Sequence, residues 1–428
     1  MKILVVGGGG REHALVMKLA ESKNTEAIYC VPGNGGISAF AECRGDIKAT
    51  DIAGVKAYAE EIKADLVVVA PDDPLVLGMV DELNAAGFVT FGPDKAAAII
   101  EGSKVFSKNL MKKYSIPTAK YEVFNNSTDA LKYIESENTY PTVVKADGLA
   151  LGKGVIIAQN YEEAKEAICS IMEDKIFGES GAEVVIEEFL TGPEVSVLCF
   201  TDGKTVKPMI SSMDHKRALD NDEGLNTGGM GTVAPNPYYT SAIAEECMRT
   251  IFMPTIEAMA SEGRPFKGCL YFGLMITPNG VKVIEYNCRF GDPETQVVLP
   301  LLDTDLTEIM LAIYEERLSD IDIKWKKESA ACIVMASGGY PKKYPTGLEI
   351  KGLDKKGQLP DAFIYHAGTK IQDGKLLTSG GRVLGVTSTG NDLRSALDKA
   401  YKAVEAISFD NVHYRKDIGK RALAAERT

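Results

Sequence analysis

The most restrictive feature of the sequence is an uninterrupted run of apolar residues at 66–70, LVVVA. Strands that are buried on both faces of a parallel sheet carry such runs. A similar run at 2–6 precedes a stretch with helical periodicity at 12–19, and a second helical stretch, 75–86, follows 66–70. Strands that alternate with helices at this spacing predict a doubly wound parallel sheet over roughly the first hundred residues.

The pattern changes further along the chain. After residue 103, strands at 142–145 and 155–158 enclose a glycine-rich loop and alternate with helices, which predicts a small α+β module of roughly 70 residues. Longer strands and helices follow, and a charged linker at 324–328 precedes short strands with glycine turns. We therefore expect α/β and α+β domains in four segments: 1–103, 104–190 with its small module at about 121–190, 191–327, and 328–428.

Composition narrows the class of protein. The chain has 428 residues, and 60 acidic against 48 basic residues give a formal charge of −12. This balance disfavours nucleic acid or an anionic membrane as a partner, and no stretch reaches the ~18 apolar residues of a transmembrane helix. Eight cysteines without a C-x-x-C pair and only four histidines disfavour a disulfide framework or a zinc site. We expect a multidomain protein of the cytoplasm.

A glycine turn at 7–10 follows the first predicted strand. The G-x-G-x-x-G pattern of a dinucleotide site fails there, because Glu12 stands where the third glycine belongs. This disfavours a nicotinamide-dependent dehydrogenase. Backbone N–H groups at the start of the helix, with Arg11 beside them, could instead hold a phosphate. A tight turn that requires glycine is the alternative, and the sequence leaves both open.

Lys145 and the loop after it form a second candidate site. A lysine at a strand end and a glycine loop between two strands suit closure over a polyphosphate, because the loop supplies backbone donors and the lysine a positive charge. It is no Walker A loop, since Gly154 stands where serine or threonine is needed. A hairpin with an exposed basic loop explains the pattern nearly as well.

The strand at 184–187 leads into a third candidate site. The backbone amides of the chain that follows could read an adenine edge between Phe189 and Leu190, and Glu194 could accept hydrogen bonds from ribose hydroxyls. The commoner explanation of such a string is a strand end with an exposed acidic pair. Spacing alone does not choose between them.

The strongest candidate site that residue spacing alone indicates lies at 283–290. In a strand, Glu285, Asn287 and Arg289 share one face, because successive side chains alternate. A carboxylate and an amide oxygen are hard donors suited to Mg²⁺, and an arginine on the same face would meet phosphates. A solvated sheet edge is the alternative, but the stretch 291–294 places further polar groups there.

Two neighbouring stretches, 214–217 and 226–231, flank an acidic segment that contains glycine. Mixed charges and glycines predict a functional loop rather than core. His215 by itself does not indicate a general base, and we expect it to be a surface histidine.

These motifs together resemble those of the glycinamide ribonucleotide synthetases, also called phosphoribosylamine–glycine ligases, which are ATP-grasp ligases of purine biosynthesis. The most specific string is 289–296, RFGDPETQ. The sequence departs from the family pattern at Asp72, where glutamate is usual, at Asn221, and at 232–235. The resemblance runs along nearly the whole chain, through strings at 9–14, 32–34, 101–104, 145–155, 214–217, 226–231, 337–341, 366–369 and 379–387.

The resemblance implies a reaction in which ATP phosphorylates glycine and 5-phosphoribosylamine attacks the glycyl phosphate. The products would be glycinamide ribonucleotide, ADP and phosphate. It further implies Mg²⁺ or Mn²⁺ as the metal, small molecules as the only partners, and a monomeric chain. Segment 1–103 would bind substrate, 104–190 and 191–327 would form the ATP-grasp core with a mobile small subdomain, and 328–428 would be a small mixed β module.

The resemblance also assigns roles to residues. Glu285 and Asn287 would hold the metal, and the catalytic residues would be Arg289, Lys145, Asp214 and Lys216. The ATP site would comprise Lys104, Lys145, Gly148, Gly152, Lys153, Gly154, Glu187, Glu188, Phe189, Leu190 and Glu194. The other substrates would meet Gly9, Gly10, Arg11, Glu12, Asn34, Gly35, Asp292 and Pro293. Another ATP-grasp ligase or carboxylase, or a non-catalytic nucleotide-binding regulator, is the alternative.

Overall fold

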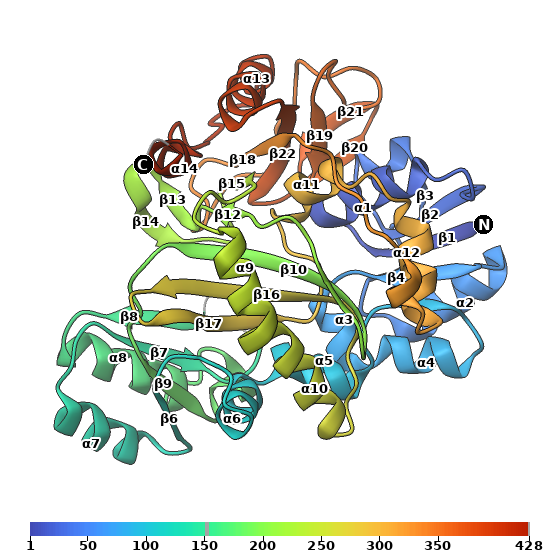
Figure 1. Ribbon diagram of the computed structural model, residues 1–428. Helices are drawn as coiled ribbons and strands as arrows, with labels where there is room; N and C mark the ends of the chain where they lie inside the picture. Colours follow the sequence, from blue (N-terminus) through green and yellow to red (C-terminus); the bar gives the residue numbers. More distant parts are fainter. Residues whose placement is uncertain (150–153, 427–428) are drawn as a thin grey trace.

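The computed structural model describes residues 1–149 and 154–426. Its N-terminal part is a parallel sheet ordered β3-β2-β1-β4-β5 (Figure 1). Side chains of β1 alternate between two cores, Leu4 packing with α2 and Val5 with α1, so the predicted doubly wound sheet is confirmed. The elements are β1 (Lys2–Gly7), α1 (Gly10–Ala20), β2 (Ala27–Pro32), β3 (Glu42–Cys43), α2 (Ile52–Ile62), β4 (Leu66–Val69) and β5 (Thr90–Phe91).

The helix expected at 75–86 is two helices, α3 (Asp72–Leu77) and α4 (Met79–Ala85). Gly78 between them has a φ of +94°, a left-handed conformation that glycine adopts without steric cost and that ends α3. A further helix that the pattern did not indicate, α5 (Lys95–Gly102), packs against α3 and precedes α6 (Lys104–Lys113). The start of α3 carries Asp72, whose carboxylate lies 3.8 Å from Arg289.

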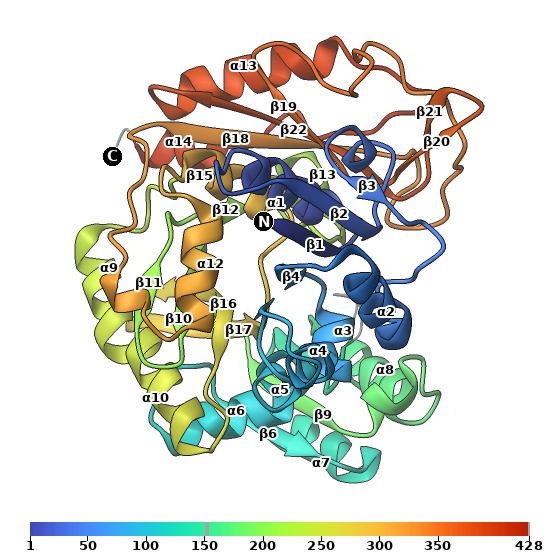
Figure 2. The same ribbon diagram turned by 90° about the vertical axis from the view of Figure 1, so that its right-hand side faces the viewer.

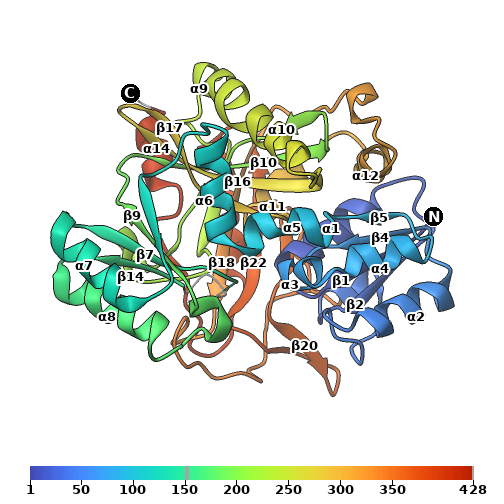
Figure 3. The same ribbon diagram turned by 90° about the horizontal axis from the view of Figure 1, so that it is seen from below.

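The small module is an antiparallel sheet ordered β6-β9-β7-β8, with two helices packed against one another on it. It has a hydrophobic core of its own and extends away from the N-terminal sheet (Figure 3). A unit with a separate core is suited to move as a body. Its elements are β6 (Tyr121–Phe124), α7 (Ser127–Glu137), β7 (Thr142–Ala146), β8 (Val155–Ala158), α8 (Tyr161–Met172) and β9 (Val184–Glu188).

A second antiparallel sheet, ordered β11-β10-β16-β17, lies in the middle of the molecule. A wider helical turn at Met248–Phe252 lies between α9 and α10. The elements are β10 (Glu194–Asp202), β11 (Val206–Pro208), α9 (Ser241–Cys247), α10 (Met253–Ser261), β16 (Lys267–Thr277), β17 (Gly280–Asn287), α11 (Thr295–Val298) and α12 (Leu306–Tyr314).

The third sheet, ordered β12-β15-β18-β22-β19, crosses the expected boundary between 327 and 328. Two of its strands come from the 191–327 segment, and α13 lies along its outer face (Figure 2). Its strands are β12 (Met213–Asp214), β15 (Gly231–Ala234), β18 (Ser329–Ala336), β19 (Phe363–His366) and β22 (Arg382–Gly390). Nearby are the hairpins β13–β14 (Arg217–Leu219, Glu223–Asn226) and β20–β21 (Thr369–Gln372, Lys375–Thr378), with α13 (Leu393–Glu405) and α14 (Lys420–Ala425). No helix within 1–149 and 154–426 is both long and apolar enough to cross a membrane.

The N-terminal sheet is joined to the third sheet by buried histidines. The His366 backbone N–H donates to Nδ1 of His13 at 2.8 Å, and both side chains are fully buried. Burial lowers the pKa of His366 to about 4, and burial together with the neighbouring His366 holds the pKa of His13 well below its usual value. Because Nδ1 of His13 accepts this hydrogen bond, a proton on Nδ1 would break it. We call this hydrogen bond the joint between the two sheets.

We predict that this joint makes the protein sensitive to mild acid. The folded state keeps both histidines neutral, whereas the unfolded chain protonates them near pH 6.5, so stability is full above pH 6.5 and falls as pH drops toward 4. A His13→Gln variant keeps an acceptor for the His366 N–H and cannot be protonated. Its thermal midpoint should fall less than that of the wild type between pH 7.5 and 4.5; parallel curves would contradict the prediction.

Candidate active site

The end of β17 places three polar side chains together, as the sequence predicts. Asn287 Oδ1 accepts a hydrogen bond from Arg289 at 3.2 Å, and Glu285 lies two residues before Asn287 on the same strand. A β-bulge opposite Gly273 and Leu274 shifts the register of β17 just before Glu285. Val283 before the bulge and Tyr286 and Cys288 after it are buried, which leaves the polar residues on the opposite face.

Four cations surround the carboxylate of Glu285. Lys216 Nζ lies 3.9 Å from Glu285 Oε1, and the side chain of Glu285 is 35% exposed. Burial would raise the pKa of Glu285, but the charges of Lys216, Lys145, Lys104 and Arg289 outweigh it and lower that pKa. We call Glu285, Asn287 and these four cations the central cluster. It is a place where negative charge is stabilised strongly.

Glu187 lies between two buried lysines. Its Oε1 is 2.8 Å from Lys145 Nζ and its Oε2 is 2.8 Å from Lys108 Nζ, with all three side chains at most 6% exposed. Lys145 also donates to the Ile284 carbonyl at 3.2 Å, which connects the small module to β17. Burial lowers the pKa of Lys108 to about 8. Lys145, which also belongs to the central cluster, thus shares the carboxylate of Glu187 with Lys108.

Lys104 is held by the start of the glycine loop. Its Nζ donates to the Gly148 carbonyl at 2.9 Å, and the side chain of Asp147 accepts hydrogen bonds from Ser103 Oγ and the Val105 amide. Burial lowers the pKa of Lys104. At the other end of the loop, the Gly154 carbonyl accepts the Ala146 N–H at 2.9 Å. The candidates Gly152 and Lys153 lie outside the described residues.

The strand that precedes the expected adenine segment ends one residue later than the sequence predicts. Strand β9 continues through Glu188, whose backbone N–H donates to the Lys120 carbonyl and whose carboxylate pairs with Lys282 at 2.6 Å. Its amide is therefore occupied, and the connection to β10 starts at Phe189 and Leu190. Phe189 is 39% exposed, so its ring can cover a ligand.

Glu194 and Lys216 form an ion pair across the cluster. Glu194 Oε2 lies 3.1 Å from Lys216 Nζ, and this carboxylate is the main cause of the raised pKa of Lys216.

Burial and the neighbouring Glu294 carboxylate raise the pKa of Asp214 well above its usual value. Asp214 Oδ1 accepts the backbone N–H of His215 at 2.7 Å. Asp214 is therefore a carboxyl that binds a proton more readily than usual.

Arg289 has acidic partners from the N-terminal part. It lies 3.1 Å from Glu101 and 3.8 Å from Asp72, the position where the sequence departs from the family pattern. Glu101 also accepts the backbone N–H of Cys288 at 2.7 Å. Among the described residues, the buried Nε of Arg289 has no hydrogen-bond partner, which leaves a donor for a bound group.

Asp292 is clamped by residues of the last segment and of α11. Arg382 lies 3.1 Å from its carboxylate and also donates to its carbonyl at 2.8 Å, while Gln296 donates to Oδ1 at 2.7 Å. Gly229 approaches Pro293 so closely that a Cβ atom would lie 2.4 Å from its ring. Asp292 and Pro293 therefore hold the loop 226–231 against the site.

The N-terminal turn offers fewer free donors than the sequence suggested. The Glu12 carboxylate accepts the Gly9 N–H at 2.7 Å and pairs with Arg11 Nε at 2.6 Å, and Arg11 also donates to the Phe290 carbonyl. A carboxylate already caps this helix. A phosphate at the turn would therefore meet Glu12, although Gly10 still lies beside Asp292 and Gln296.

Asn34 is a structural joint between the first and last segments. Its Nδ2 donates to the Gly8 and His366 carbonyls, and its Oδ1 accepts the Gly36 and Ile37 N–H groups. These four bonds satisfy the side-chain amide. The Gly35 N–H donates to the Thr369 carbonyl at 3.1 Å, so it too is occupied.

Models of the phosphoribosylglycinamide synthetase N domain, ATP-grasp (A) domain and C domain match residues 1–101, 102–295 and 330–421. The chain belongs to the phosphoribosylglycinamide synthetase family. A phosphoribosylamine–glycine ligase of Caldanaerobacter subterraneus subsp. tengcongensis is 48% identical over 418 residues, 98% of this chain and 99% of that protein. The family resemblance seen in the motifs is thereby confirmed.

Solved structures agree with this family and with the ATP-grasp fold. The crystal structure of the phosphoribosylamine–glycine ligase of Thermotoga maritima has a TM-score of 0.84 at 33% identity, and the match covers 98% of this chain and 100% of that one. The biotin carboxylase domain of Hydrogenobacter thermophilus 2-oxoglutarate carboxylase has a TM-score of 0.73 at 15% identity, over 96% and 91% of the chains. At that identity the likeness shows a shared fold.

Four charged residues of this member of the synthetase family have contacts that local pattern does not indicate: Lys108, Glu101 and Glu294 are buried, and the side chain of Arg382 is 20% exposed. Lys108 sits on α6 within the string KNLMKK, which has the composition of a solvated helix face. Glu101 lies at the end of α5, Glu294 within RFGDPETQ, and Arg382 in the last segment. The string containing Glu294 was singled out but its buried carboxylate was not, because burial of a charge is not visible in a local pattern.

Proposed function

We propose that this chain joins glycine to 5-phosphoribosylamine with ATP, giving glycinamide ribonucleotide, ADP and phosphate, a step of purine biosynthesis. The observation that carries the proposal is the central cluster, where Glu285 and Asn287 lie among four cations. Membership of the phosphoribosylglycinamide synthetase family supports the choice of substrates. By the family resemblance, the chain would act as a monomer in the cytoplasm.

Glycine's carboxylate must be activated before an amine can attack it, because oxide is a poor leaving group. In the proposed reaction, a carboxylate oxygen attacks the γ-phosphorus of ATP, the bond to the β–γ bridging oxygen breaks, and ADP leaves. The amine nitrogen then attacks the carbonyl carbon of glycyl phosphate, phosphate leaves, and the nitrogen loses a proton. Such phosphoryl transfer needs positioning and charge neutralisation more than covalent help.

On the ATP side, Lys104 and Lys145 would contact phosphates, and the segment 147–154, of which 150–153 lie outside the described residues, would cover them. Phe189 and Leu190 bound the adenine, and Glu194 accepts from the ribose once Lys216 turns to the reacting groups. The carbonyls of Asp147 and Gly148 accept hydrogen bonds from Lys104, which places the start of this segment beside a proposed phosphate-binding lysine. Closure excludes water from glycyl phosphate.

Glu285 and Asn287 fit a divalent cation, Mg²⁺ or Mn²⁺. Their oxygens are hard donors on one face of β17, and Glu285 is ionised and partly open to solvent. The ion would neutralise charge on the β- and γ-phosphates. Beside it, Arg289 would bind the transferring group through its unpartnered Nε.

The acceptor side lies around Asp292 and Pro293. Asp214, whose pKa is raised by burial and by Glu294, is suited to take the proton released when the amine attacks. Lys216 would hold the acyl phosphate. The turns at Gly9–Glu12 and Asn34–Gly35 would border the phosphoribosylamine pocket, contributing backbone shape more than free side chains.

The test is ADP release by the purified protein with Mg²⁺ and ATP, followed with glycine, with phosphoribosylamine generated in place, with both and with neither. We expect turnover only with both substrates, and glycinamide ribonucleotide by mass spectrometry. An arm with bicarbonate is included because the fold is shared with a biotin carboxylase. Turnover with bicarbonate in place of glycine would overturn the substrate assignment, and ATP binding without turnover would indicate a regulator.

A further inference from the structure

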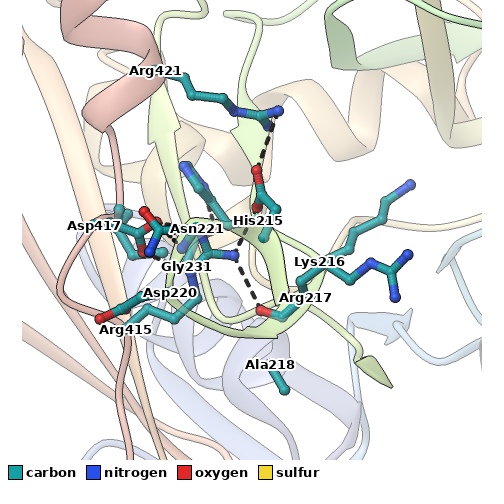
Figure 4. Close-up of polar contacts among 12 residues, drawn as sticks. His215, Lys216, Arg217, Ala218, Asp220, Asn221, Gly231, Arg415, Asp417 and Arg421 are labelled. Atoms are coloured by element: carbon teal, nitrogen blue, oxygen red, sulfur yellow. Dashed lines mark hydrogen bonds and ion pairs between the residues drawn. The ribbon is translucent and has the colours of Figure 1, made fainter. Parts of the chain in front are cut away.

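His215 lies between two residues of the proposed active site but faces away from it. Its neighbours Asp214 and Lys216 belong to the site, and Lys216 points away from the ring of His215 (Figure 4). The side chain of His215 is only 2% exposed, so the expectation of a surface histidine is wrong. His215 and Lys216 lie in the connection between the strands Met213–Asp214 and Arg217–Leu219.

The ring of His215 bridges two backbone groups from separate elements. Nδ1 lies 3.1 Å from the Gly231 carbonyl, and Nε2 lies 3.2 Å from the Gly419 nitrogen. The Gly419 N–H can only donate, so Nε2 must accept, and Nδ1 carries the proton that it donates to Gly231. The His215 N–H donates to the same Gly231 carbonyl at 2.9 Å. One histidine thus ties the loop to β15 and to the start of α14.

Both partners of the ring are held firmly. A Cβ atom at Gly231 would lie 2.7 Å from the Cys332 carbonyl, and one at Gly419 would lie 2.6 Å from Leu397. Their backbones are therefore packed closely against β18 and α13. A bridge to such groups restrains the residue that makes it.

The charged groups around the ring keep it neutral. Burial, followed by the charges of Arg415 and Arg421, lowers the pKa of His215 to about 4, although Asp222 opposes them. Arg415 is itself buried and pairs with Asp222 and Asp417. The bridge is therefore intact throughout the neutral pH range.

We propose that His215 is a positioning residue: its bridge from Gly231 to Gly419 holds the backbone that directs Asp214 and Lys216 into the active site. This inference rests on the proposed function, because it assigns His215 an effect on the same reaction. The ring does not touch substrate. Its contribution is to reduce the freedom of the two residues beside it, and small misplacement of reacting groups has large effects on rate.

A cavity beside the ring makes a chemical test feasible. It has a volume of about 350 Å³, and His215 lines it together with Asn221, Asp222, Arg415 and Arg421. In a His215→Ala variant, free imidazole can enter the space that the ring has left. Imidazole carries both a donor and an acceptor nitrogen, whereas 1-methylimidazole has the acceptor alone and cannot bridge.

We expect His215→Ala to lower kcat at least ~10-fold while the KM for ATP changes less than ~2-fold, because the bridge orients Asp214 and Lys216 rather than the nucleotide. Imidazole at about pH 8, where it is mostly neutral, should restore most of the rate, and 1-methylimidazole should not. His413→Ala is the matched control. That ring contacts the Ala218 carbonyl at 2.7 Å on the same hairpin, but has no bond to 214–216, so kcat should be unchanged.

The outcomes separate this inference from the proposed function. A wild-type kcat in His215→Ala, or equal rescue by both imidazoles, would overturn the inference. If the alanine variant does not fold, His215→Gln, whose amide can donate and accept, should fold and keep more than ~30% of the rate; a loss as large as that expected for alanine would count against the bridge. If the wild type has no turnover, the proposed function fails. Hydrogen–deuterium exchange of segment 212–218 still tests the bridge then, and no change in His215→Ala would overturn it.

Discussion

Glu285→Gln is expected to lower glycine-dependent ATP turnover by at least ~10², or about 2.7 kcal/mol of transition-state stabilisation, the size typical of losing one preorganised charge-stabilising group. Glutamine keeps the shape and one oxygen but removes the charge. In the wild type, this charge faces Lys216, Lys145, Lys104 and Arg289. Without it, four cations lose their common carboxylate and a divalent cation loses its only charged ligand from β17.

The measurement is kcat at saturating ATP and both substrates, together with the Mg²⁺ concentration that gives half-maximal rate. That concentration should rise in the variant, and the thermal midpoint should stay near that of the wild type, because the side chain is 35% exposed. Glu262→Gln serves as a control, since this carboxylate pairs with the exposed Lys113 and is not part of the central cluster. A wild-type rate at saturating Mg²⁺ would contradict the assignment of Glu285.

Glu187→Gln is expected to cost about 3 to 5 kcal/mol of stability in the small module, the usual effect of removing one partner from a buried ion pair. Glu187 is the carboxylate that Lys108 and Lys145 share, each at 2.8 Å. Its loss leaves two ammonium groups close together in a buried site. ATP affinity should fall as well, because Lys145 loses the group that orients it.

Thermal unfolding and hydrogen exchange of β9 measure this loss. The deficit should be largest at pH 6 to 7 and shrink as pH rises past 8, because burial lowers the pKa of Lys108 to about 8 and a neutral lysine needs no partner. Glu188→Gln is the matched control: its pair with Lys282 is partly exposed, so its loss should cost less than ~1 kcal/mol. Equal losses of stability in the two variants would contradict the prediction that the buried pairs of Glu187 matter more than the partly exposed pair of Glu188.

The acid-sensitive joint and His215 have the same physical basis. In each case, a buried neutral histidine ring accepts a backbone N–H, from His366 to His13 and from Gly419 to His215. Protonation would remove the acceptor, and burial opposes it. The first connects two sheets, whereas the second orders a loop beside the proposed site.

Local pattern was sufficient for much of the fold and for one face of the site. Apolar runs such as 66–70 predict strands of a parallel sheet because burial on both faces requires continuous apolar side chains. Alternation places Glu285, Asn287 and Arg289 together because residues two apart share a face. RFGDPETQ indicates the family without any structure.

The tertiary structure decided what depends on residues far apart in the chain. Lys108 and Glu187 are 79 positions apart and meet only when α6 packs on β9. The third sheet takes β12 and β15 from one expected segment and three strands from another. His215 meets Gly419 204 positions away. Periodicity records which face of an element is buried but not which distant group will satisfy a buried charge or polar atom. Those pairings follow from how the elements pack.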